Sequence, residues 1–129
     1  MNIGFIVGIA GVFVVPIVFL VIGWLFTHGR YPKHPNEVYG YRTTRSMKND
    51  ETWAFAQERW GRLCWRAGWW LLMLSLLFVA ILQTQSVRQH GLYVGAWITV
   101  QGVLTLGTIL PVERALKNTF DEFGRRKTF

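Results

Sequence analysis

The sequence predicts an all-α membrane protein with three transmembrane helices, plus an amphipathic helix at the cytoplasmic interface between the first two spans. Two properties predict this fold. The chain is 51% hydrophobic but only 16% charged, whereas a soluble domain carries about 25% charged residues. Its apolar residues lie in three long blocks rather than at amphipathic spacing, which is typical of membrane-spanning helices. We therefore expect residues 1–129 to form a single membrane domain.

The first span is predicted at residues 4–26, which contain no charged residue. A helix of this length measures roughly 35 Å, enough to cross a hydrocarbon core about 30 Å thick. A cleaved signal peptide is the main alternative. However, the segment lacks a basic start and ends in Trp24-Leu25-Phe26 rather than in small residues. We therefore expect a retained anchor with a kink at Pro16, which a lipid-embedded helix tolerates.

Two further spans are predicted at residues 63–82 and 92–110. The uncharged part of the second block is short, and it begins only after Arg66. We expect the Arg66 side chain to extend toward the lipid headgroups, which lets the span start one turn earlier. The third block is uncharged and is followed by Pro111, where we expect the span to end.

The distribution of Lys and Arg predicts the orientation of the spans. Residues 27–62 hold seven and residues 111–129 hold five, whereas the connection 83–91 holds only Arg88. Loops rich in Lys and Arg stay on the cytoplasmic side of a membrane. We therefore predict a multi-pass plasma-membrane protein with its N-terminus outside, a cytoplasmic loop at 27–62 and a cytoplasmic tail at 111–129. This explanation of the net charge of +7 is preferred to nucleic-acid binding.

The loop at 27–62 carries the signals of a turn followed by a helix. Pro32 and Pro35 disfavour helical backbone at the residues before them. Asn49 is a suitable N-cap, and apolar residues then recur at steps of three and four. This apolar face comprises Trp53, Ala56, Trp60 and Cys64. We expect the helix to lie along the cytoplasmic interface and either to turn or to run directly into the second span.

A string of residues in this loop is similar to a known family. It consists of an Asn, a Gly-Tyr-Arg-Thr turn, a Ser, and a Trp and an Ala that begin the next helix. The residues are Asn36, Gly40, Tyr41, Arg42, Thr43, Ser46, Trp53 and Ala56. Together with Pro111-Val112-Glu113 after the third span, this pattern resembles the SdpI family of bacterial membrane proteins, in a short, three-span form. The resemblance covers about residues 36–123.

The resemblance implies immunity to, or sensing of, a membrane-active antimicrobial peptide. The founding member of that family protects the bacterium that secretes such a peptide. It also acts as a signalling receptor, because the toxin-bound protein holds a repressor of its own operon at the membrane. The implied partners are membrane lipids, a toxin peptide and a cytoplasmic repressor, without direct contact to nucleic acid. The implied location is the bacterial plasma membrane.

The sequence contains no convincing catalytic, cofactor or metal motif. His28, His34 and Cys64 follow neither a CxxC nor an HExxH pattern, and His90 is expected on the other side of the membrane. A nucleophile elbow and a phosphate-binding loop are also missing from the sequence. We therefore predict a protein that is not an enzyme and that uses no cofactor and no metal.

A polar and cationic cluster is expected at the cytoplasmic face. Its members are Asn36, Tyr41, Arg42, Thr43, Arg45, Ser46 and Glu113. Arg42 is predicted to pair with Glu113, because the third span brings Glu113 to the same side as the loop. Two interpretations remain open. Either the pair locks the loop against the bundle, or the arginines bind a lipid phosphate or a peptide carboxylate.

The second interpretation supports an alternative function, that of a lipid- or solute-handling membrane protein. Transport would require a homo-oligomer, because three spans in one copy enclose no obvious pathway. Under either function, the basic tail Arg125-Arg126-Lys127 is a candidate anchor to anionic lipids.

Overall fold

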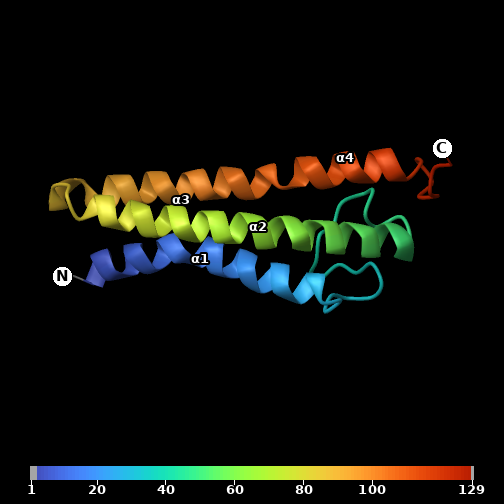
Figure 1. The fold of residues 1–129 in the computed structure, drawn as a ribbon, viewed down its shortest axis with the longest axis horizontal. Coiled ribbons are helices and arrows are strands. Elements are labelled where there is room, and N and C mark those ends of the chain that lie inside the picture. Colours follow the sequence, from blue (N-terminus) through green and yellow to red (C-terminus); the bar gives the residue numbers. More distant parts are fainter. Residues whose placement is uncertain (1–2, 129) are drawn as a thin grey trace.

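The computed structural model describes residues 3–128 of the chain, and all of its regular elements in that range are helices. They are α1 (Ile3–Thr27), α2 (Asp50–Leu82), the short 3-10 helix η1 (Val87–Gln89), α3 (His90–Gly107) and α4 (Ile109–Thr119). The helices lie side by side in an elongated bundle (Figure 1). Residues 28–49, the first turns of α2, the helix α4 and the C-terminal tail all lie at one end, which we call the loop end. The start of α1 and the connection between α2 and α3 lie at the opposite end (Figure 1).

Three helical segments are long and apolar enough to cross a membrane. They are Ile3–Thr27, Asp50–Leu82 and Val87–Thr119. Many of their large apolar side chains face outward, including Val14, Leu77 and Val103, which are 55%, 56% and 64% exposed. A surface of this kind suits lipid rather than water, because soluble proteins rarely expose large contiguous apolar patches. The predicted all-α fold with three spans is confirmed.

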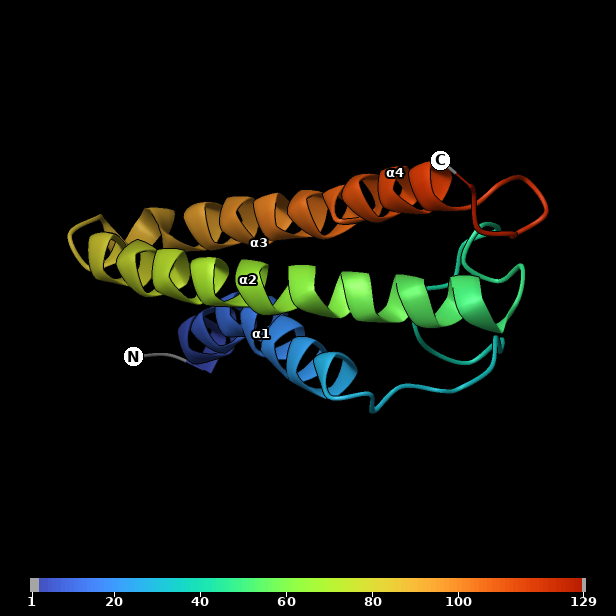
Figure 2. The same cartoon turned by 45° about the vertical axis from the view of Figure 1, so that its right-hand side comes forward.

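Helices α1 and α2 approach each other closely at three glycines. A methyl group added at Gly23 of α1 would lie 2.6 Å from the backbone nitrogen of Trp65. One added at Gly61 of α2 would lie 2.6 Å from the Cβ of Phe26. Gly68, two turns further along α2, is similarly close to Leu20. Small residues of this kind allow the backbones of membrane helices to pack directly. Figure 2 shows α1 running at an angle to α2.

Pro16 in α1 is accommodated by a polar contact from α3. Because proline has no N–H, the carbonyl of Val12 four residues earlier loses its helical donor. The buried Gln101 side chain donates to this carbonyl at 3.0 Å and to the hydroxyl of Ser75 at 3.0 Å. Trp97 donates to the same hydroxyl at 3.1 Å. These contacts join all three spans inside the apolar part of the bundle.

The predicted helix after Asn49 exists, but it is not a separate element. Asn49 caps α2 as expected, since its side chain accepts from the backbone of Thr52 and the Thr52 hydroxyl accepts from the backbone of Asn49. From this cap α2 continues unbroken for 33 residues to Leu82. Of the two continuations left open by the sequence, the direct one is therefore present. That the first turns lie along a membrane interface stays a prediction.

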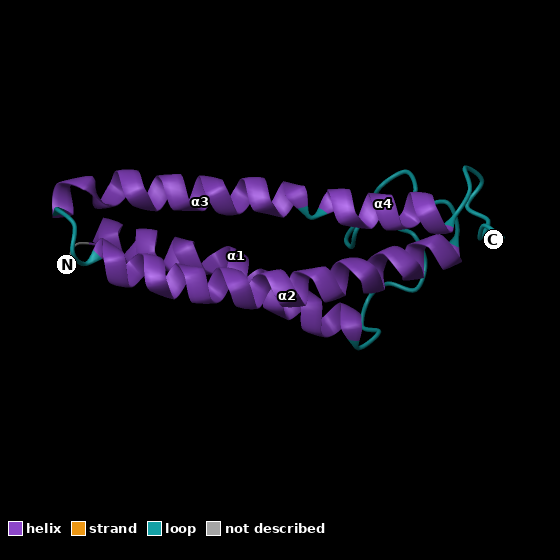
Figure 3. Ribbon diagram, turned by 45° about the horizontal axis from the view of Figure 1, so that its top comes forward, coloured by secondary structure: helices purple, strands orange, loops and turns teal. Residues whose placement is uncertain are grey.

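Helical structure continues beyond Pro111, the residue at which the third span is predicted to end. Where the membrane-embedded part of the chain ends stays a prediction. Helix α3 stops at Gly107, and α4 begins at Ile109 after an interruption at Thr108 (Figure 3). Pro111 therefore lies in the first turn of α4, where a helix needs no N–H from that residue. The Thr108 hydroxyl at the interruption accepts from the indole of Trp60 at 3.2 Å. Much of the expected tail is thus a helix that packs beside α2.

Candidate functional site

The Gly-Tyr-Arg-Thr turn is joined to α4 through Tyr41. The Tyr41 ring is buried among Ala56, Val112, Leu116 and Phe120. Its hydroxyl donates to Glu113 Oε1 at 2.7 Å. Burial and this bond to a carboxylate raise the pKa of Tyr41 well above its usual value. The phenol therefore stays protonated and connects the loop to the end of the third span.

Arg45, and not Arg42, is the cationic partner of Glu113. Arg45 Nε lies 3.7 Å from Glu113 Oε2, and both side chains are partly exposed. Arg42 instead faces solvent, and its guanidinium donates to the backbone carbonyl of Glu37. The predicted Arg42–Glu113 pair is therefore wrong. Since the Tyr41 side chain is turned inward, the side chain of its neighbour is turned away from the bundle.

A buried glutamine of α2 holds the backbone of the turn. Gln57 is fully buried, accepts from the Tyr41 N–H at 2.6 Å and donates to the Tyr41 carbonyl at 2.8 Å. Gly40 has a φ of +116°, and an added Cβ there would lie 2.9 Å from Gln57 Oε1 and 3.0 Å from the Trp53 ring. Only glycine meets both the dihedral and the spatial requirement. Gln57 is not among the residues predicted for this site, although a glutamine beside the apolar face of a helix is a detectable signal.

Thr43 and Ser46 close the turn and lead into α2. The Thr43 N–H donates to the Ser46 hydroxyl at 2.8 Å, and the Ser46 N–H donates to the Thr43 hydroxyl at 3.2 Å. The fully buried Ser46 hydroxyl also lies 3.0 Å from the carbonyl of Tyr41. Thr52 of α2 then donates to the Ser46 carbonyl at 3.0 Å. These hydroxyls satisfy backbone groups of a buried turn, which is a structural role.

The earlier part of the loop is ordered by Asn36 and Trp53. The Asn36 side chain accepts from the backbone N–H groups of Val38 and Tyr39 at 2.9 and 3.0 Å, which forms an Asx-type turn. The indole of the fully buried Trp53 donates to the Pro32 carbonyl at 2.6 Å. The structure therefore brings the predicted residues together at the loop end, where their polar groups bond to other groups of the same chain.

The C-terminal tail folds back onto the start of α2. The Asn49 side chain donates to the Gly124 carbonyl at 2.7 Å, and Arg126 pairs with Glu51 at 2.8 Å. Gly124 has a φ of +78°, and an added Cβ would lie 2.7 Å from the Asn49 amide. The contact between residues so distant along the chain carries no signal in the sequence. The role of the basic tail as a lipid anchor stays a prediction.

The titratable side chains near this region are not gathered into a metal site. His34 pairs with Asp50 at 2.8 Å, His28 stacks on Trp24, and Cys64 is buried in the bundle. Within residues 3–128, no group of three His, Cys, Asp or Glu side chains is placed to hold a metal ion. What the site offers chemically is a rigid turn that exposes Arg42 and leaves the Arg45–Glu113 pair partly accessible.

Comparison with known proteins identifies the family that the motif of the loop resembles. The sequence model of the SdpI/YfhL protein family matches residues 33–112, from the loop through α2 and α3 to the first turn of α4. No curated protein and no solved structure matches the chain. The matched segment is more than half of the chain. It contains the Gly-Tyr-Arg-Thr turn, the Gln57 side chain that binds its backbone, and two of the spans. The chain is therefore a multi-pass membrane protein that belongs to the SdpI/YfhL family.

Proposed function

We propose that this chain is a non-enzymatic protein that protects against, or senses, a membrane-active antimicrobial peptide. One observation supports this function most directly: the family's Gly-Tyr-Arg-Thr turn is held rigidly by Gln57 and Glu113 and presents Arg42 to solvent. A preorganised surface loses little conformational entropy when a ligand binds. Such a turn suits recognition of a peptide, and it requires no catalytic group.

Arg42 is the residue that we assign to contact with the ligand. Its guanidinium donates to the backbone carbonyl of Glu37, and within residues 3–128 no carboxylate forms an ion pair with it. A guanidinium can form two parallel hydrogen bonds to a carboxylate. A peptide carboxylate, for example at a C-terminus, is therefore the group that we expect it to bind.

Gene deletion and complementation test the proposal. Cells that lack the gene are exposed to the secreted peptides of their own strain and its neighbours, and survival is compared after complementation with wild type, Arg42→Gln or Lys48→Gln. Lys48 is a matched control because it is an exposed cation of the same loop. We expect wild type and Lys48→Gln to restore survival and Arg42→Gln to restore about tenfold less protection, as for loss of a charged hydrogen bond. Unchanged survival of the deletion strain across a broad panel would contradict immunity.

A lipid- or solute-handling protein is the second candidate, and the same exposed Arg42 supports it. In this case the ligand of the guanidinium is a lipid phosphate, and transport requires several copies of the chain. Purified wild-type protein would then retain a lipid beside Arg42 that Arg42→Ala loses. If both proteins carry the same lipids, this candidate is wrong and the peptide proposal is unaffected.

A further inference from the structure

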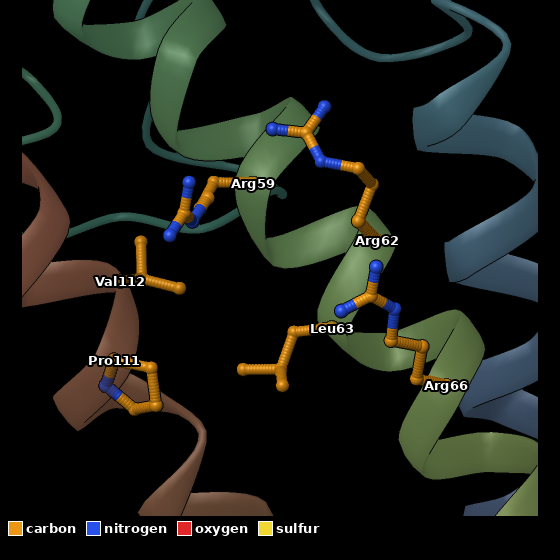
Figure 4. Close-up of a pocket in the computed structure, with 6 residues that line it drawn as sticks. All are labelled: Arg59, Arg62, Leu63, Arg66, Pro111 and Val112. Carbon is orange, nitrogen blue, oxygen red and sulfur yellow. The ribbon is translucent and has the colours of Figure 1, made fainter.

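A groove between α2 and α4 is lined by three arginines of α2. Arg59, Arg62 and Arg66 follow one another at steps of three and four residues, which places them on one side of the helix. Leu63 of α2 and Pro111 and Val112 of α4 complete the lining of this space, which has a volume of about 250 Å³. Figure 4 shows the Arg59 side chain extending toward Val112 and the Arg66 side chain beside Leu63. None of these arginines belongs to the Gly-Tyr-Arg-Thr turn.

In the part of the chain that the structure describes, these three guanidinium groups form no ion pair. Three other arginines have acidic partners: Arg45 pairs with Glu113, Arg125 with Asp121 and Arg126 with Glu51. Among residues 3–128, no carboxylate lies within 4.0 Å of a guanidinium nitrogen of the three groove arginines. Like charges on successive turns repel and destabilise a helix. An arrangement of this kind is favourable when an anion from outside the chain lies between the charges.

The groove lies where the apolar surface of the bundle begins. Gly61 of α2 touches Phe26, which is next to the last residue of α1. Arg66 is the last charged residue before the uncharged segment 67–87, and Val112 is the last residue of the uncharged segment 91–112. The uncharged stretches of all three spans therefore end at about the same level. This is the level at which the headgroups of the surrounding lipids are expected.

We propose that this groove binds the phosphate of an anionic phospholipid at the loop end of the bundle. The guanidinium groups of Arg59, Arg62 and Arg66 donate to the phosphate oxygens. Leu63 and Pro111 contact the glycerol and the first carbons of an acyl chain, which continues along the apolar surface. Basic pockets between membrane helices at the headgroup level are suited to such lipids. Planar guanidinium groups match phosphate better than lysine does, because they donate two parallel hydrogen bonds.

Native mass spectrometry of the purified, delipidated full chain tests the proposal. The probes are phosphatidylglycerol, zwitterionic phosphatidylcholine and inorganic phosphate, each added in a titration. We expect wild-type protein to bind phosphatidylglycerol at least about tenfold more tightly than phosphatidylcholine, as for a site with charged hydrogen bonds. Inorganic phosphate at the same concentration is expected not to displace the lipid, because it makes no apolar contact.

Two sets of variants separate a built site from attraction by charge alone. The triple variant R59Q/R62Q/R66Q should lose the preference for phosphatidylglycerol. The matched control Arg114→Gln removes an exposed arginine of α4 that does not line the groove, and it should bind like wild type. The triple lysine variant R59K/R62K/R66K keeps the charges that orient the spans. It should fold and insert normally but bind phosphatidylglycerol several-fold more weakly than wild type.

Three results would overturn the proposal. Equal binding of phosphatidylglycerol and phosphatidylcholine to wild type would exclude a site selective for anionic lipid. Full binding by the triple lysine variant would show that charge alone attracts the lipid. Displacement of the lipid by inorganic phosphate would identify the ligand as a free anion. Because the lysine variant retains the net charge, the test remains decisive even where the glutamine variant does not insert.

Discussion

At the scale of single residues, buried hydrogen bonds decide how the loop is held against the helices. Tyr31 shows this on the α1 side of the loop, as Tyr41 does on the α4 side. The Tyr31 ring packs against Phe26, and its hydroxyl donates to Glu58 of α2 at 2.7 Å. Each tyrosine thus connects the loop to a carboxylate of a different helix. Both bonds require the phenol to keep its proton.

Because the pKa of Tyr31 is raised in the folded protein, we expect the protein to lose stability at alkaline pH. Burial, and then the bond and charge of Glu58, raise the pKa of Tyr31 from 10.0 to about 12. A group whose pKa is higher in the folded than in the unfolded chain stabilises the fold fully below the unfolded pKa. Its contribution is therefore complete below pH 10 and falls as the pH rises through about 12.

Tyr31→Phe is the variant that isolates this effect. In the variant, the decrease in thermal stability between pH 10 and pH 12 should be smaller than in wild type. The difference between the tyrosinate absorbance titrations of the two folded proteins should have its midpoint near pH 12. A midpoint near 10 would show that Tyr31 is neither buried nor bonded to Glu58 in the folded protein.

At the scale of helices, direct backbone contact between α1 and α2 predicts a strong dependence on side-chain size. Gly23→Ala places a methyl group 2.6 Å from the Trp65 backbone, so the helices must separate. We expect this variant to lose about 1–3 kcal/mol of stability, as overpacked cores do. Unfolding in detergent, followed by circular dichroism, measures the loss.

Gly102→Ala in α3 is the matched control. Apart from its own turn of helix, an added Cβ at Gly102 would meet no atom within 4 Å, and alanine is the better helix former by about 1 kcal/mol. This variant should be as stable as wild type or slightly more stable. If both variants lose the same stability, the close approach of α1 and α2 is not what makes Gly23 necessary.

The sequence predicted the elements that depend on local composition and missed those that depend on the direction of a side chain. The three uncharged blocks and the Asn49 cap are local signals, and they were sufficient for three spans and the start of α2. Glu113 contacts Tyr41 and Arg45 rather than the predicted Arg42, because Tyr41 is turned inward and Arg42 outward, and no local pattern specifies which of two neighbours in a turn faces the bundle. The two hydrogen bonds of Gln57 to the Tyr41 backbone exist only after the loop has folded over α2, so no local pattern in the sequence indicates them.

At the scale of the whole molecule, the charges are concentrated at one end. Every Asp, Glu, Lys and Arg except Arg88 belongs to the loop end or to the segments that lead into it. The opposite end of the bundle therefore carries almost no side-chain charge. The family assignment and the three spans leave the direction of insertion open, and the positive-inside rule supplies it: the loop end is predicted to be cytoplasmic.

This orientation can be measured with single cysteines, but the native one is a poor reporter. Cys64 is fully buried, so failure to label it would carry no information on its side of the membrane. In a Cys64→Ala background, Val38→Cys and Val87→Cys place thiols at two positions of similar exposure, 80% and 78%. Val38 lies in the loop between α1 and α2, and Val87 lies in η1 at the opposite end.

A membrane-impermeant maleimide applied to intact spheroplasts should label Val87→Cys and leave Val38→Cys unlabelled. After lysis both variants should be labelled to the same extent, which controls for the reactivity of each thiol. Labelling of Val38→Cys from outside would place the Gly-Tyr-Arg-Thr turn and the arginine groove on the external face. Arg42 would then meet a secreted peptide directly at the external surface. With the predicted orientation, such a peptide must first cross the bilayer to reach Arg42.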